Sequence, residues 1–92
     1  MSESVVEQQV ADRLAARLRE LREGLDLTQE EVAERAGISR NHYQLLEIGW
    51  GNRQSKVPAN PRLSTLTNLC HVLGTTVPDL IAAMYPAESS GR

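Results

Sequence analysis

The sequence has a single cysteine, no long apolar run and no excess of basic residues over acidic ones. With only Cys70 present, a disulfide within the chain is excluded, and we expect this residue to be a small buried core group. No apolar run approaches the roughly 18 residues that cross a bilayer, so no membrane association is expected. The first residues carry acids where a secretory signal would carry bases, and these features together predict a cytoplasmic protein.

Groups that perform catalysis or bind metals are also missing. No nucleophile with its base and no phosphate-binding loop is present. Cys70 and His71 are neighbours on a predicted helix, so they point different ways, and no second pair completes a zinc site. Glu30 and Glu31 fall in the first turn of a predicted helix, where they favour its dipole and do not form a catalytic pair. We therefore expect no enzyme activity, no cofactor and no metal.

The net charge of −2 argues against a uniformly basic surface of the kind that binds nucleic acid. The charges are unevenly distributed along the chain, however. Residues 40–62 contain one acid, Glu47, against four bases, which are Arg40, Arg53, Lys56 and Arg62. A basic middle segment can therefore present one positive face on an acidic protein.

Apolar residues at helical spacing dominate the pattern. From Val10 to Leu25 they recur every three or four residues and predict a helix that ends near Gly24. A fourth helix, over residues 61–73, carries one apolar side made of Leu63, Leu66, Leu69, Cys70 and Leu73. A fifth begins near Thr76, and no segment has a strand pattern. The sequence therefore predicts an all-α fold of five helices.

The second and third helices have clear start and stop signals. Thr28 followed by Glu31 forms a capping box, which predicts a helix that ends at Gly37. Ser39 then caps a third helix, which Gly49 ends. The interval between the two helices is too short for antiparallel packing, so they should cross at a steep angle.

A chain of 92 residues allows a single domain. We expect this domain to cover residues 10–85. Residues 1–9 lack a clear apolar stripe and are interpreted as an N-terminal arm, with an extra helical turn as the alternative. Residues 86–92 are polar and are expected to form a flexible tail.

The segment from Gln29 to Ile48 has the residue types that two steeply crossing helices need. A small side chain, Ala33, falls at the crossing, and Gly37 allows the positive φ of the turn. Inward anchors are expected at Ile38, Tyr43 and Leu46. This arrangement leaves an outer face made of Arg40, Asn41, Gln44 and Leu45. Arg, Asn and Gln are the side chains whose geometry matches guanine and adenine edges in the major groove.

With these features the sequence resembles the Cro/CI-like helix-turn-helix repressors of phages and bacteria. The resemblance covers about residues 10–84, and it is strongest in LREGLDLTQEEVAERAGIS, in LEIG and in PRLSTL. It implies a compact domain of the lambda-repressor-like type. It also implies a sequence-specific regulator of transcription that binds double-stranded DNA, most often as a repressor. Because one such domain contacts few base pairs, a homodimer on a palindromic operator is expected.

The resemblance also assigns roles to single residues. Gln29 and Ser39 are expected to contact phosphates, with help from the amides at the start of the second helix. Arg40 and Asn41 should contact bases. Arg22 is expected to form a structural pair with Glu47. The full set of expected DNA contacts is Gln29, Ser39, Arg40, Asn41, His42, Gln44, Leu45, Arg53, Lys56 and Arg62.

The sequence departs from the family pattern in three places. His42 and Tyr43 put an imidazole on the exposed side and a phenol where an aliphatic side chain is usual. Arg62 occupies a position that Ser or Thr commonly fills. The loop between Gly49 and Pro61 is longer than usual, and it is expected to be anchored by Trp50 and to place Arg53 and Lys56 on the DNA backbone.

Two questions about partners stay open at this point. Dimerisation is expected to use the C-terminal helix, through Leu80, Ile81, Met84 and Tyr85, with Val5 and Val6 as the competing surface. The alternative function is a protein-interaction module, such as the antitoxin of a toxin–antitoxin pair. A basic surface on the third helix and the loop would favour DNA, and an exposed apolar groove there would favour a protein partner.

Overall fold

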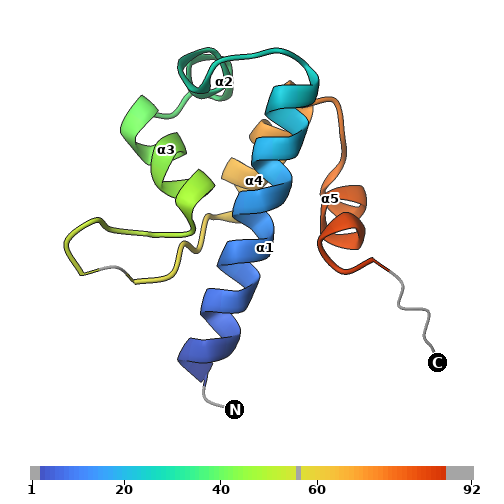
Figure 1. Cartoon of the computed structure of the whole chain (residues 1–92). Helices are drawn as coiled ribbons and strands as arrows, with labels where there is room; N and C mark the ends of the chain where they lie inside the picture. Colours follow the sequence, from blue (N-terminus) through green and yellow to red (C-terminus); the bar gives the residue numbers. More distant parts are fainter. Residues whose placement is uncertain (1–2, 56, 87–92) are drawn as a thin grey trace.

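The computed structural model describes residues 3–55 and 57–86, and over these it forms five helices around one core (Figure 1). They are α1 (Glu3–Gly24), α2 (Gln29–Ala36), α3 (Arg40–Ile48), α4 (Leu63–Val72) and α5 (Val77–Met84). The described residues contain no strand, only an isolated bridge between Trp50 and Pro58. The predicted all-α fold of five helices is therefore confirmed. Among the described residues, none of the helices combines the length and apolarity that crossing a bilayer requires.

Helix α1 is the central element of the fold. Helices α2 and α3 lie on one side of it and α5 lies on the other, with α4 behind (Figure 1). The core residues of α1 are Ala11, Leu14, Ala15 and Leu18, which repeat at helical spacing and are all buried. Ala11, Leu14 and Leu18 belong to one core cluster with Val32, Tyr43, Leu46, Leu69 and Leu80 from the other four helices. The α2–α3 unit is thus fixed to a scaffold formed by the rest of the chain.

Local sequence signals set the ends of α2 and α3. The Thr28 hydroxyl accepts a hydrogen bond from the Glu31 amide at 3.0 Å, and the Thr28 amide donates to the Glu31 carboxylate at 2.8 Å, which is the predicted capping box. Gly37 ends α2 in the left-handed region at φ +76°. The Ser39 hydroxyl then accepts from the His42 amide at 3.0 Å and caps α3. Ala33, predicted at the helix crossing, is 2% exposed.

The ends of α1 differ from the prediction. The helix begins at Glu3, so the segment interpreted as an arm is helical from there on, and the extra-turn alternative is closer to the structure. Val10 and Leu25, predicted on the apolar stripe, are exposed at 38% and 49%, so the buried face of α1 is narrower than the pattern indicated. The left-handed residue after this helix is Asp26, at φ 60°, and Gly24 itself has an ordinary φ. Apart from Pro86, the expected tail lies outside the described residues.

The C-terminal helix divides the four residues that were predicted to form a dimer interface. Leu80 is 1% exposed and Met84 is 4% exposed, because both pack into the core of the protomer. The prediction is therefore corrected for these two residues. Ile81 and Tyr85 lie on the outer side of the same segment and are exposed. Leu63, predicted on the apolar side of α4, is exposed as well.

Candidate nucleic-acid interface

The first turn of α3 projects polar side chains into solvent. Ser39, Arg40, Asn41 and His42 are all exposed, and Gln44, one turn later, is half-buried. Arg40 and Gln29 both line a shallow depression of about 620 Å³ between the end of α1 and the starts of α2 and α3. Helix α3 thus presents Arg40 and Asn41 to solvent, two of the side-chain types whose geometry matches base edges in the major groove.

Leu45 does not belong to this exposed face. It is 8% exposed, because the long loop that follows α3 turns back over it. The Trp50 amide donates to the Leu45 carbonyl at 3.0 Å, and Leu45, Trp50 and Pro61 line a small cleft of about 140 Å³. The predicted DNA contact of Leu45 is therefore corrected: Leu45 belongs to the interior that this loop closes.

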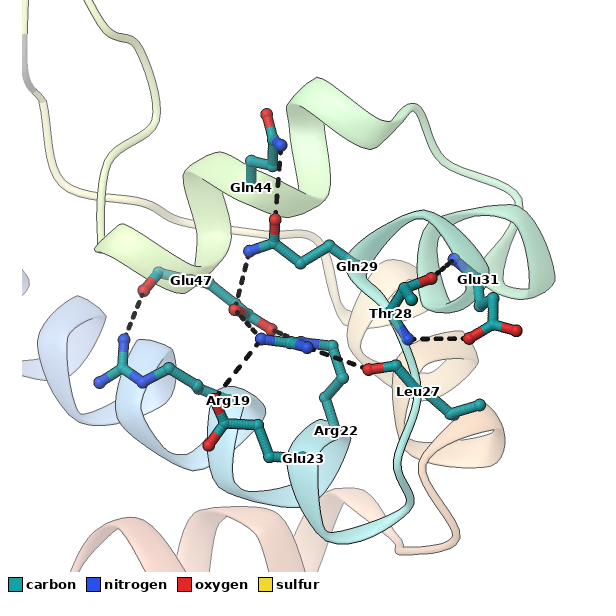
Figure 2. A network of polar contacts seen from close by, with 9 residues as sticks. All are labelled: Arg19, Arg22, Glu23, Leu27, Thr28, Gln29, Glu31, Gln44 and Glu47. Atoms are coloured by element: carbon teal, nitrogen blue, oxygen red, sulfur yellow. Dashed lines mark hydrogen bonds and ion pairs between the residues drawn. The ribbon is translucent and has the colours of Figure 1, made fainter.

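A charged pair ties α1 to the end of α3 (Figure 2). Arg22 donates from Nε to Glu47 Oε2 at 2.6 Å and from Nη2 to Glu47 Oε1 at 3.1 Å. Its Nη1 donates to the Leu27 carbonyl at 3.0 Å, which fixes the connection between α1 and α2. Arg19 donates to the Glu47 carbonyl at 3.3 Å. This is the pair that the resemblance implied, and it clamps α3 onto α1 in a two-pronged geometry.

The charge state of this pair follows from its surroundings. Burial alone would raise the pKa of Glu47, but the hydrogen bonds from Arg22 and Gln29 and the positive charge of Arg22 outweigh it and hold that pKa below its ordinary value. The hydrogen bond to Glu47 raises the pKa of Arg22. Burial, and then the nearby Glu47 carboxylate, raise the pKa of Tyr43. At neutral pH the carboxylate is therefore ionised and the phenol is neutral.

Gln29 extends this network toward the outer face of α3. Its amide nitrogen donates to Glu47 Oε1 at 2.9 Å, and its amide oxygen accepts from Gln44 Nε2 at 3.4 Å (Figure 2). The phosphate contact expected of this side chain stays a prediction. Here one of its two amide hydrogens holds the buried carboxylate and its oxygen positions Gln44.

The long loop between α3 and α4 is closed by its own backbone. The Gly51 amide donates to the Val57 carbonyl at 2.7 Å, and the Ala59 amide donates to the Gly49 carbonyl at 3.0 Å. The side chain of Arg53 turns back onto α3, with Nε 3.5 Å from Asn41 Oδ1. Lys56, the other predicted contact in this loop, lies outside the described residues.

Arg62 stands at the start of α4, exposed, with no side-chain hydrogen bond that caps the helix. It lines a depression of about 340 Å³ together with His42 and Thr65. The structure thus brings together His42 and Arg62, which sequence reasoning singled out separately. Within residues 3–55 and 57–86, no group of three or more His, Cys, Asp or Glu side chains could hold a metal ion.

Two short helices that cross at a glycine turn, with the second presenting a polar face, define a helix-turn-helix protein. The model of the family described as "Helix-turn-helix domain" matches residues 13–84, and the chain therefore belongs to that family. Together with the structural likeness described next, this membership identifies the protein as a DNA-binding regulator of transcription. Its assignment to the Cro/CI-like branch in particular stays a prediction.

The fold is similar to two crystal structures of the clp gene regulator ClgR from Corynebacterium glutamicum. One gives a TM-score of 0.68 at 25% identity and covers 82% of this chain and 71% of the other. The second gives a TM-score of 0.67 at 25% identity and covers 82% of this chain and 86% of the other. A comparison with curated protein sequences gave no match.

Proposed function

We propose that the protein is a sequence-specific transcriptional repressor that binds a palindromic operator as a homodimer. The observation that carries this proposal is the exposed first turn of α3, where Arg40 and Asn41 lead and Gln44 follows. The charged pair beneath holds this helix rigidly, which favours base reading because the side chains keep a fixed register. Arg40, Arg53 and Arg62 are exposed on α3, the following loop and the start of α4, and their positive charge favours contact with DNA phosphates.

Contacts to DNA phosphates would be made on both sides of the base contacts of α3. Ser39 and His42 are exposed at its start, and Arg62 lines the same depression as His42. Contacts of this kind set the register of a protein on the duplex and carry no sequence information. We assign Ser39, His42 and Arg62 to phosphates and Arg40 and Asn41 to bases.

Arg40→Ala should relax base preference at one half-site position and weaken operator binding by about 1–3 kcal/mol, because a two-pronged contact to guanine is lost. The operator is first obtained by selection from random duplex DNA, and binding is then measured on a panel of its single-base variants. Arg35→Ala, which removes the same charge from the exposed last turn of α2, is the matched control and should weaken all sequences alike. An unchanged preference profile in the Arg40 variant would remove this residue from the base-reading set.

The proposed dimer surface combines the outer side of the C-terminal segment with the neighbouring exposed part of α1. The Arg13 guanidinium donates to the Met84 carbonyl at 3.0 Å and lies 4.9 Å from the centre of the Tyr85 ring. The end of α5 therefore lies beside α1 next to Arg13. Val10 precedes Arg13 by three residues and is exposed, so it lies on the same side of α1. With exposed Ile81, these residues make an apolar surface that a second copy of the chain would cover.

Ile81→Asp should keep the fold and give monomers, because Ile81 is 41% exposed and its charge would be buried only in the dimer. Sedimentation equilibrium measures the mass, and binding to a full operator and to a half-site measures the consequence. Asn68→Asp places a charge on an exposed position of α4 and is expected to stay dimeric. A dimeric Ile81 variant would show that the copies associate through another surface.

A further inference from the structure

The side chain of Arg53 lies against α3, although the residue belongs to the loop that follows this helix. Its Nε is 3.5 Å from Asn41 Oδ1, and its Nη2 is 3.4 Å from Gln44 Oε1. Asn41 and Gln44 are one turn apart on α3, so the guanidinium spans their two amide oxygens. A loop arginine that served only the DNA backbone would have no reason to turn toward the amides of α3.

The loop backbone gives Arg53 a defined starting point. Asn52 Oδ1 accepts hydrogen bonds from the amides of Gln54 at 2.7 Å and Ser55 at 3.0 Å, which closes a turn around Arg53. The antiparallel bridge between Trp50 and Pro58 closes the base of the same loop. These hydrogen bonds thus fix the backbone from which the Arg53 side chain extends.

The amide orientations under Arg53 are fixed by charge at both ends. The Glu47 carboxylate can only accept, so Gln29 must donate to it and turn its oxygen outward. That oxygen receives the Gln44 amide nitrogen, which turns the Gln44 oxygen toward Arg53. The Arg53 guanidinium can only donate, which matches the acceptor oxygen that Gln44 turns toward it. Figure 2 shows its inner part, from Glu47 through Gln29 to Gln44.

This arrangement leaves Arg53 able to bind a further acceptor. A guanidinium carries five N–H donors, and the two contacts on α3 use one at Nε and one at Nη2. The hydrogens on Nη1 and the second on Nη2 remain, and the side chain is exposed. A pair of parallel N–H donors is what the O6 and N7 atoms of guanine accept in the major groove.

We propose that Arg53 is a specificity-determining residue that reads a guanine of the operator beside Asn41 and Gln44. The proposal rests on the DNA-binding function proposed above and adds a reader from outside the helix-turn-helix. The buried Glu47 carboxylate fixes the orientation of the Gln29 amide, and Gln29 in turn fixes that of the Gln44 amide. The Gln44 oxygen then accepts from Arg53 and holds its guanidinium in position for the base edge. The lengthened loop thus widens the set of bases that one protomer reads.

The test compares Arg53→Lys and Arg53→Ala with the wild type by selection from random duplex DNA, followed by titrations at several salt concentrations. Lysine keeps the charge and loses the paired planar donors. Arg53→Lys should therefore keep the salt slope while one guanine position loses about 5- to 150-fold of its discrimination. Arg53→Ala should lose the same preference with little change in slope, because the slope counts the phosphates that the protein neutralises and Arg53 is assigned to a base. Gln54→Ala, in the same exposed turn, is the control and should change neither.

The possible outcomes separate this inference from the function on which it rests. Loss of preference at one position in the lysine variant, at an unchanged salt slope, supports base reading by Arg53. An unaltered profile in both variants, with a lower slope for alanine only, makes Arg53 a phosphate contact and overturns the inference while the proposed function stands. If the wild-type chain selects no sequence at all, the proposed function fails and the inference fails with it.

Discussion

Replacing Arg22 with alanine is expected to lower the free energy of unfolding by about 3–5 kcal/mol, the range for breaking a buried ion pair from one side. The side chains of Arg22 and Glu47 are 14% and 3% exposed, so the carboxylate that remains cannot reach water without moving α3. Domains of this kind are stable by about 5–15 kcal/mol in total. The variant should therefore be marginal at room temperature, and urea unfolding would measure the loss.

The loss should depend on pH in a direction that identifies its cause. In the wild type the pKa of Glu47 is lowered, so its contribution is complete above the unfolded value near 4.5 and is lost as the pH falls through the folded pKa. In Arg22→Ala burial remains while the main opposing contact is gone, so the pKa of Glu47 should rise above that value. The stability difference between variant and wild type should then shrink as the pH falls from 7 toward 4.5.

Two control substitutions are expected to lower the free energy of unfolding by less than Arg22→Ala does. Arg17 pairs with Glu20 at 3.2 Å, but their side chains are 35% and 67% exposed, so Arg17→Ala should cost at most about 1 kcal/mol. Glu47→Gln keeps the shape of the side chain and leaves an arginine that can turn to solvent, so it should cost less than Arg22→Ala. If Arg22→Ala lowered the free energy of unfolding by the same amount between pH 7 and 4.5, lost packing would be the cause, and the unpaired Glu47 carboxylate would not.

The parts of the fold that the sequence predicted are those set by neighbours in the chain. The Thr28 capping box and the left-handed Gly37 depend on a few consecutive residues, and both were predicted correctly. The pair of Arg22 with Glu47 spans 25 positions, and it was available only through the resemblance to a family. Short-range rules therefore account for where the helices begin and end, and the contact between α1 and α3 needed information about a whole fold.

The site residues that the sequence misplaced have two causes. Leu45 is apolar on an outward-facing stripe until the loop from Trp50 covers it, and the course of that loop has no periodic signal. For the same reason the contact of Arg53 with Gln44 could not be predicted, since it depends on how an irregular segment folds back. The dimer prediction failed at Leu80 and Met84 because helical periodicity gives an apolar face without saying whether the protomer or a partner covers it.

A charge on the buried side of α5 is expected to have the second large effect, which is loss of the fold. Met84→Asp should abolish folding, because Met84 is 4% exposed and sits in the core, where burying a carboxylate in place of an apolar side chain carries a large desolvation cost. Truncating such a side chain to alanine already costs about 2–5 kcal/mol, and a buried charge adds to that loss. Far-UV circular dichroism and thermal unfolding would record the absence of a cooperative transition.

Two substitutions decide whether burial is the reason. Met84→Leu nearly conserves volume and polarity, so it should stay folded at a cost below about 1.5 kcal/mol. Ile81→Asp puts the same charge on the same helix at an exposed position, and it should stay folded as a monomer. The contrast between the two aspartates separates the core of the protomer from the surface proposed to join two copies. If Met84→Asp folded as well as Ile81→Asp and only dissociated, Met84 would belong to the interface, and the inward position of α5 against α1 and α4 would be wrong.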